Sequence, residues 1–277
     1  MRETRLAIAR LKQLIVGLED AAVAVSGGVD SMTLAVIAGR VLGRRARMIH
    51  AVSPAVPPQA TERVRRYAEA ENWSLALLDA GEFEDQRYRA NPVDRCFYCK
   101  HSLYTAIRGE TAAVILSGTN MVDLEDFRPG LEAARQHEVR HPYVEAGIDK
   151  SGVRAIARAL ELDDLADLPA APCLSSRIET GIRIEADSLA FINRVELRIQ
   201  DATAASVVRC RVRADGIEIE LDAASLLRLG SESRAALERE VAAMAGEWGI
   251  GEKRGSPSVR FAPYRQGSAF LRAESGI

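Results

Sequence analysis

The sequence has few cysteines, no excess of positive charge and no long apolar run. Its four cysteines in 277 residues are too few for a disulfide framework and are typical of a reducing compartment. No uninterrupted apolar stretch reaches about 18 residues, so we expect no transmembrane helix and a cytoplasmic location. Residues 1–20 are amphipathic and contain acids, which predicts a first helix rather than a signal peptide.

Charge and composition narrow the class of protein further. The 37 Lys and Arg residues are balanced by 39 Asp and Glu, and the pI near 6.2 argues against a surface coated for nucleic acid. We therefore expect neither a nucleic-acid nor a membrane partner. A hydrophobic content of 47% is that of an ordinary globular protein, and the length suits about two domains.

In the first half, short apolar runs alternate with helical patterns. Strands are expected at 21–25, 46–52, 74–78 and 112–118, with helices between them that include 30–42 and 58–71. This alternation predicts an α/β fold with a parallel sheet flanked by helices. Ligands then bind beyond the carboxyl ends of the strands.

The pattern changes after about residue 150. Two period-2 runs, 206–213 and 216–221, are joined by a short turn and predict a hairpin between helices at 185–200 and 222–248. We predict a first domain over 1–160 and a smaller α+β domain over 161–277. The Gly-, Ser- and Arg-rich tail from 251 is expected to be flexible.

A glycine-rich stretch, SGGVDS, directly follows the first predicted strand and opens the next helix. Gly27 and Gly28 allow a sharp turn and a close approach to an anion, and a helix amino terminus favours phosphate. Ser26 and Ser31 can donate hydroxyl hydrogen bonds, and Asp30 can orient a metal-bound phosphate. No Gly-Lys-Ser/Thr follows, so this is not a Walker-type loop. The alternative, an ordinary glycine turn, is disfavoured by the complete pattern.

The cysteines allow three kinds of site. Cys96 and Cys99 form a C-x-x-C beside cationic residues. Half of a zinc site would need a second ligand pair, which the sequence lacks, whereas the flanking cations suit a redox pair. With Cys173 added, three thiolates suit an iron–sulfur cluster with one open iron. Cys210, in a strand-like alternation, is interpreted as a packed residue and is the candidate for a fourth ligand.

The motifs together resemble those of the LarE family, PP-loop sulfur transferases of nickel-pincer nucleotide cofactor biosynthesis. The resemblance runs from about residue 20 to 220 and carries, in order, SGGVDS, NPVDRCFYCK, SGTNMVDLEDFRPGLEAA, HPYVEAGIDKSGVRAIA, APCLSSR and RVRADGIEIEL. It implies a PP-loop domain that binds ATP and Mg²⁺, and a homo-oligomer. The end of the fourth strand, at Gly118, Thr119 and Asn120, would help to hold the adenosine.

The resemblance also implies the chemistry. ATP adenylates a carboxylate of pyridinium-3,5-biscarboxylic acid mononucleotide with release of pyrophosphate, and sulfur then displaces AMP to give a thiocarboxylate. In some members the cysteine matching Cys173 gives up its sulfur and is left as dehydroalanine. In others three cysteines hold a 4Fe–4S cluster whose open iron carries sulfide from a donor. Because Cys96 and Cys99 accompany Cys173, we favour the cluster form.

Further residues are assigned to the substrate, some by this resemblance and some by their place in the sequence. Glu196 would lie near the sulfur site, although a surface glutamate is the alternative. Arg128 would lie on the nucleotide side, or else in a structural turn. From its place four residues after Cys173, Arg177 is a candidate to neutralise the substrate's phosphate or carboxylates; the alternative is a solvated loop arginine. From their alternation on one hairpin face, Arg211 and Arg213 are suited to gripping a phosphate; the alternative is an exposed strand face. The stretch Ile-Glu-Thr-Gly at 178–181 departs from the Ile-Pro-Tyr-Gly of many members, so the substrate loop is expected to differ in shape.

Three other functions compete with this one. A PP-loop tRNA-thiolating enzyme would need an RNA-binding module and a basic face, and neither is evident. A non-catalytic adenine-nucleotide-binding regulator is disfavoured by the intact Ser26, Asp30 and Ser31. An ammonia-using amide synthetase would not need the cysteines.

Overall fold

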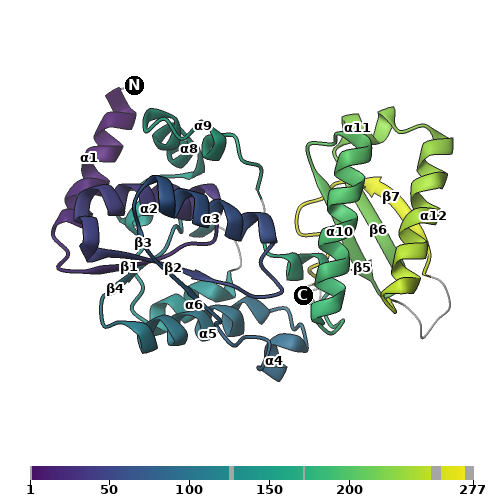
Figure 1. The fold of residues 1–277 in the computed structure, drawn as a ribbon, viewed down its shortest axis with the longest axis horizontal. Coiled ribbons are helices and arrows are strands. Elements are labelled where there is room, and N and C mark those ends of the chain that lie inside the picture. Colours follow the sequence, from purple (N-terminus) through teal and green to yellow (C-terminus); the bar gives the residue numbers. More distant parts are fainter. Residues whose placement is uncertain (1, 125–127, 171, 251–256, 272–277) are drawn as a thin grey trace, which may run out of the picture. The chain divides into compact units, whose positions relative to one another are not determined.

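The protein consists of two compact units (Figure 1). The structure, a computed structural model, describes residues 2–124, 128–170, 172–250 and 257–271. Unit 1 comprises Met1–Asp85 and Asp94–Ala171, and unit 2 comprises Gln86–Val93 and Pro172–Ile277. The chain therefore contributes to unit 2 twice, first through the short segment 86–93 and then from Pro172 onward.

Unit 1 is built on a four-stranded parallel sheet with the order β3-β2-β1-β4. Its strands are β1 (Ala21–Ala24), β2 (Ala46–Ala51), β3 (Ser74–Leu78) and β4 (Val114–Leu116). They lie where the sequence predicts strands, and the α/β fold with a parallel sheet is confirmed. Because β1 pairs with both β2 and β4, the strand order reverses beside β1, and a ligand crevice forms at such a reversal.

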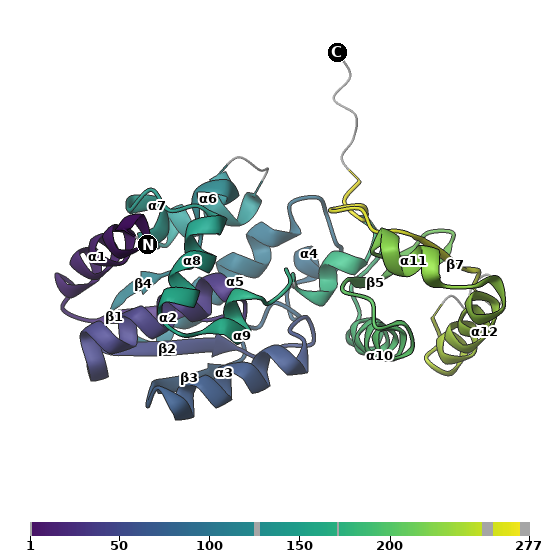
Figure 2. The same ribbon diagram turned by 90° about the horizontal axis from the view of Figure 1, so that it is seen from above.

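Helices cover both faces of this sheet, and α2 and α3 lie over the same face (Figures 1 and 2). That face carries α1 (Arg2–Val16), α2 (Val29–Leu42), α3 (Pro58–Ala70), α8 (Lys150–Ala159) and α9 (Asp163–Ala166). The other face carries α5 (Arg95–Glu110) and α6 (Pro129–Gln136). In β1, the side chains of Ala21 and Val23 pack in the hydrophobic core on the face covered by α2, and that of Ala22 packs in the core on the face covered by α5. Successive side chains of a strand point to opposite faces, which explains this alternation. Among the described residues, no helix combines the length and the apolar character needed to cross a bilayer.

Unit 2 is a three-stranded sheet packed with helices. The hairpin of β5 (Val208–Arg213) and β6 (Gly216–Leu221) confirms the one predicted, and β7 (Val259–Pro263) pairs with β6 in parallel. The helices are α4 (Gln86–Arg89), α10 (Ala186–Thr203), α11 (Ala223–Arg228) and α12 (Ser231–Glu247). The outer edge of β5 is covered by Ile178, which bridges Val212, so the sheet has no free edge there.

Two sequence-based expectations for unit 2 are corrected. The helix predicted over 222–248 is two helices, because Asp222 caps α11 and Gly230 begins α12 in an extended conformation. The tail predicted to be flexible from 251 contains β7, whose residues 259–263 complete the sheet beside β6. Its composition of Gly, Ser and Arg hid this short strand. Residues 251–256 and 272–277 of that tail lie outside the described residues.

Asn91 fixes the segment 86–93 to the rest of unit 2. Its backbone has a φ of 56°, a left-handed conformation that asparagine tolerates, and its side chain is fully buried. The Nδ2 group donates to the carbonyls of Glu179 and Ile182, both at 2.8 Å, and Gly181 N donates to Asn91 O at 2.9 Å. One side chain therefore organises the whole turn at 178–182.

We expect Asn91→Ala to lower the free energy of unfolding of unit 2 by about 2–4 kcal/mol, because buried carbonyls lose their donors and alanine occupies a left-handed conformation. Urea unfolding followed by circular dichroism measures this. The control is Asn72→Ala, at an exposed asparagine with a φ of 52°, which incurs only the backbone cost of about 1 kcal/mol. Equal losses in the two variants would contradict the role given to the Asn91 amide.

Candidate functional site

In unit 1 the candidate site lies where the loops after β1 and β4 meet the start of α2. Gly27 has a φ of +80°, and a Cβ there would stand 2.8 Å from Ala60 O at the start of α3. Arg63 of the same helix donates from Nη1 to Gly27 O at 2.8 Å. Glycine is thus required at position 27 by both conformation and space.

The two serines of the loop hold its turn closed. Ser26 N donates to Ser31 Oγ at 3.0 Å, and the two hydroxyls lie 3.0 Å apart. Gly28 is the N-cap of α2, and no side chain among the described residues caps this helix. The first N–H groups of α2 therefore have no helical partner and face the position where an anion binds best.

Gly118 brings the loop after β4 directly against the first turn of α2. A Cβ at this position would lie 2.7 Å from Ser31 N and 2.8 Å from the carbonyl carbon of Asp30. Any side chain here would fill the cradle that the two loops form. Gly118, expected to help hold the adenosine, thus lies directly against the glycine-rich loop, as a close approach of backbone to backbone.

Asp30 lies at the centre of a polar cluster. Its carboxylate forms an ion pair with Lys150 Nζ and accepts from Asn120 Nδ2 at 3.3 Å, while its carbonyl accepts from Tyr143 OH at 3.0 Å. Lys150 was not predicted from the sequence. The available signal was a lysine in the first turn of a helix, where the dipole disfavours a cation. Both charged side chains are partly exposed and can reach a phosphate or a phosphate-bound metal.

Of the other residues predicted for the nucleotide, Thr119 lies in the loop after β4, and Arg128 pairs with Asp123, which follows that loop. Ser117 Oγ, at the end of β4, contacts Thr119 Oγ1 at 3.0 Å and His141 Nδ1 at 2.8 Å. Burial lowers the pKa of His141, which favours a neutral imidazole there. Arg128 pairs with Asp123 at 2.8 Å, and Asp123 in turn accepts from the backbone of the loop after β4.

The cysteines occupy three different environments. Cys96 and Cys99 are half-buried in the first turn of α5, and their spacing of three puts both on one face of the helix. Cys173 is exposed at the start of a short 3₁₀ helix, Leu174–Arg177, in unit 2. Cys210 is fully buried in β5, and burial raises the pKa of its thiol, as a packed residue requires.

Arg177 is a buried cation that organises the loop of Cys173. It donates from Nη1 to Pro172 O at 2.6 Å and Cys173 O at 3.2 Å, and from Nε and Nη2 to Glu196, both at 2.9 Å. Burial disfavours its charge, but the Glu196 carboxylate outweighs this and raises the pKa of Arg177. Glu196 also accepts from Cys210 N at 2.9 Å. Both residues are therefore internal, and neither the solvated loop arginine nor the surface glutamate considered above is present.

Arg211 and Arg213 share one face of the hairpin, but that face is covered. Arg211 donates from Nε to Glu220 at 2.9 Å and from Nη1 to Ser176 O at 3.1 Å. Arg213 donates from Nη2 to Glu218 at 2.5 Å. The side chains of the two arginines are 4% and 8% exposed, so each is held by internal acceptors.

Neither unit by itself brings together, among its described residues, three His, Cys, Asp or Glu side chains arranged for a metal ion. The predicted cluster ligands Cys96, Cys99 and Cys173 come from both units, so that assignment stays a prediction. The donor chemistry fits the group, because two thiols on one helical turn and a third, exposed thiol are typical of three-cysteine cluster ligation.

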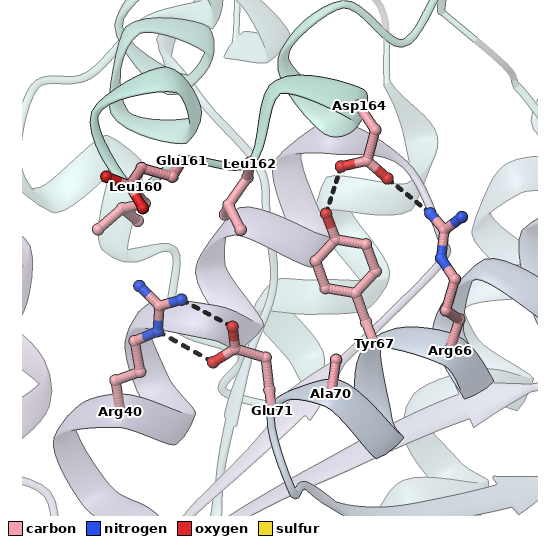
Figure 3. A pocket seen from close by; sticks show the side chains of 9 residues that line it. All are labelled: Arg40, Arg66, Tyr67, Ala70, Glu71, Leu160, Glu161, Leu162 and Asp164. Carbon is pink, nitrogen blue, oxygen red and sulfur yellow. Dashed lines mark hydrogen bonds and ion pairs between the residues drawn. The ribbon is translucent and has the colours of Figure 1, made fainter.

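Unit 1 also has a pocket of about 340 Å³ that shares no residue with this site (Figure 3). Both of its arginines are paired with acids: Arg40 pairs with Glu71 at 2.7 Å, and Asp164 accepts from Arg66 at 2.6 Å and from Tyr67 OH at 2.5 Å. Glu161 adds a further negative charge to the lining. The pocket lacks the uncapped helix terminus and the glycines that make the loop after β1 suited to phosphate.

The chain is similar to curated proteins along most of its length, although no family model matches it. It is 37% identical over 194 residues to the uncharacterized protein slr1717 of Synechocystis sp., which covers 69% of this chain and 72% of the relative. It is 28% identical over 214 residues to the pyridinium-3,5-bisthiocarboxylic acid mononucleotide synthase of Lactiplantibacillus plantarum, covering 76% and 77%. A third relative, the uncharacterized protein MJ0830 of Methanocaldococcus jannaschii, is 24% identical over 210 residues, covering 74% and 79%.

Glu196→Gln should lower the free energy of unfolding of unit 2 by about 3–5 kcal/mol, because the buried Arg177 guanidinium would lose its countercharge. Chemical unfolding followed by circular dichroism gives the value. Glu240→Gln is the matched control, since Glu240 pairs with Arg198 on the surface, where such a pair contributes about 0–1 kcal/mol. A loss at Glu196 no larger than that at Glu240 would show that the pair is not a structural anchor.

Proposed function

We propose that this chain is an ATP-dependent sulfur transferase of the LarE family, because it is 28% identical to a pyridinium-3,5-bisthiocarboxylic acid mononucleotide synthase. Its substrate is pyridinium-3,5-biscarboxylic acid mononucleotide, whose carboxylates become thiocarboxylates of the nickel-pincer nucleotide cofactor. The observation that carries the ATP half of this proposal is the uncapped start of α2 against Gly118, with Asp30 and Lys150 beside it. Free N–H groups, a cation and a carboxylate are what a triphosphate and its Mg²⁺ need.

In the first half of the reaction the substrate carboxylate is activated. One of its oxygens attacks the α-phosphorus of ATP, a P–O bond breaks, and pyrophosphate leaves. The N–H groups at the start of α2 and Lys150 would balance the charge that develops on the phosphates. Asp30 would orient the metal-bound oxygens, while Gly118 and Asn120 would border the adenosine. A carboxylate is a poor electrophile until this step gives it AMP as a leaving group.

In the second half a sulfur nucleophile attacks the acyl carbon and AMP leaves with the oxygen. Cys173 is exposed, as a sulfur donor or carrier must be. Arg177 holds the carbonyls of Pro172 and Cys173, and Glu196 holds Arg177, so we assign both to positioning of the Cys173 loop. Arg211 and Arg213 are assigned to the phosphate of the mononucleotide.

The sulfur source follows from the three cysteines. Cys96, Cys99 and Cys173 would hold a 4Fe–4S cluster, which supplies an open iron site for exchangeable sulfide. The pairing of Cys96 and Cys99 on one helical turn supports this over a single-use cysteine, for which Cys173 alone would suffice. A homo-oligomer and a sulfide donor belong to the same proposal.

With ATP, Mg²⁺, sulfide and the mononucleotide, we expect AMP, pyrophosphate and a thiocarboxylate product, detected by mass spectrometry. Gly118→Ala should lower kcat/KM for ATP about a hundredfold, because its Cβ displaces the first turn of α2. Gly17→Ala is the control, since a Cβ there meets nothing within 4 Å. Pyrophosphate release that requires tRNA instead of the mononucleotide would replace this proposal with the tRNA-thiolating alternative.

Anaerobically prepared protein should contain a near-stoichiometric cluster by iron and acid-labile sulfide analysis, and Cys96→Ser should lose it. Cys210→Ala is the control and should retain it, because this thiol is buried in β5 as a packing residue. Absence of iron after anaerobic reconstitution would reject the cluster and leave Cys173 as a single-use donor. Loss of iron in Cys210→Ala would make Cys210 the fourth ligand.

A further inference from the structure

In unit 2 the segment Tyr264–Leu271 follows β7 and covers the arginine face of the hairpin. Arg211 donates from Nη2 to Arg265 O at 3.3 Å. Arg213 donates from Nη1 to Ser268 O at 2.7 Å and from Nη2 to Ser268 Oγ at 3.1 Å. The segment thus takes up N–H groups of both arginines that are assigned to the substrate's phosphate.

Thr180 fastens this segment. Its backbone N–H and its hydroxyl both donate to Ala269 O, at 3.0 and 3.3 Å, and its Oγ1 accepts from Leu271 N at 3.1 Å. Beside it, Glu179 lies 3.7 Å from Arg213 Nη1. These two residues are the Glu-Thr of the Ile-Glu-Thr-Gly stretch at which this sequence departs from its family, and their contacts give that departure a structural role.

We propose that Tyr264–Leu271 is an autoinhibitory strap, latched by Thr180, that the phosphate of the mononucleotide must displace from Arg211 and Arg213. This inference rests on the proposed function, because it takes the mononucleotide as the ligand. It makes Thr180 and Ser268 determinants of substrate affinity.

The groups that accept hydrogen bonds from Arg211 and Arg213 differ in how readily a phosphate replaces them. Glu218 and Glu220 accept through their side-chain carboxyl groups from guanidinium groups, and such charge-assisted bonds are about twice as strong as bonds between neutral groups. To the arginines the strap offers only carbonyls and a hydroxyl, although that hydroxyl, Ser268 Oγ, also donates to Glu220 at 2.5 Å, and this bond is exchanged for water when the strap leaves. A phosphate forms stronger bonds to guanidinium than these neutral groups do, so it replaces the strap and leaves the carboxylates in place. The released carbonyls of Arg265 and Ser268 then bond to water.

If only molecules with an open strap bind substrate, the apparent affinity equals the affinity of the open form multiplied by the fraction of molecules that are open. Thr180→Val keeps the shape of the side chain and the backbone bond to Ala269 but removes both hydroxyl bonds. At about 0.5 kcal/mol for each of these two bonds, the lower end of the usual net contribution, the open fraction rises about fivefold.

The experiment compares Thr180→Val with the unmodified protein in two measurements. Binding of nicotinate mononucleotide, a pyridinium mononucleotide with one carboxylate, is followed by calorimetry, and KM and kcat are measured with the full substrate. Hydrogen exchange of residues 264–271 is recorded with and without the mononucleotide. Thr203→Val is the control, because Thr203 Oγ1 also donates to one backbone carbonyl and accepts from one N–H in unit 2, at the end of α10.

We expect Thr180→Val to bind the mononucleotide about fivefold more tightly and to lower KM by the same factor at unchanged kcat. The amides of residues 264–271 should exchange faster in this variant, and also in the unmodified protein once ligand is added, while Thr203→Val changes nothing. Equal or weaker binding by Thr180→Val with normal turnover would overturn the strap and leave the proposed function intact. Tighter binding without turnover in any protein would keep the strap and reject the sulfur transfer. Absence of mononucleotide binding in both proteins would overturn both.

Discussion

The absence of a side chain at Gly118 is the constraint on which the proposed nucleotide site depends. The reversal of strand order beside β1 brings the loops after β1 and β4 to one crevice, but topology alone leaves their separation open. Because Gly118 has no side chain, the backbone of the loop after β4 lies directly against the first turn of α2. Asn120 then reaches Asp30, and the uncapped start of the helix becomes one wall of a cradle rather than a surface feature. The charge of Lys150 completes the same wall from α8.

Unit 2 depends on a different interaction, the pairing of buried guanidinium groups with buried carboxylates. In a strand of period two, the alternation of Arg and Val in β5 and of Glu and Ile in β6 puts all the charges on one face. Removing such pairs from water is costly, and apolar residues would often stabilise the sheet as well or better. Their presence is explained by what they position. Arg177 holds the carbonyls beside Cys173, and Glu196 fixes Arg177 while also covering the edge of β5 at Cys210.

The elements and loops of unit 1 could be predicted because their signals are local. A buried strand, two glycines and a helical pattern predict the glycine-rich loop between β1 and α2 without any knowledge of distant residues. The contribution of Lys150 depends on where α8 packs. The roles of Gly118 and Asn91 depend on which backbone segments approach them, so none of the three follows from the spacing of residues in the sequence. Alternation correctly placed Arg211 and Arg213 on one face, but it carries no information on whether that face is covered. The segment 264–271 that covers this face, and β7 directly before it, lie far along the chain in a stretch whose composition suggests a loose tail.

A covered arginine face also bears on selectivity. Open arginines would bind any phosphate, and free inorganic phosphate is small and highly charged. In unit 2 the charges are already matched, with Glu218 and Glu220 held close to Arg213 and Arg211. An incoming phosphate must displace the strap and add negative charge to a balanced, buried network, which is unfavourable for a bare anion. A mononucleotide brings further contact area with its phosphate, through its ribose and its aromatic ring. Covering the arginines therefore weakens the binding of every phosphate, but it favours a mononucleotide, whose further contacts offset the cost, over free inorganic phosphate.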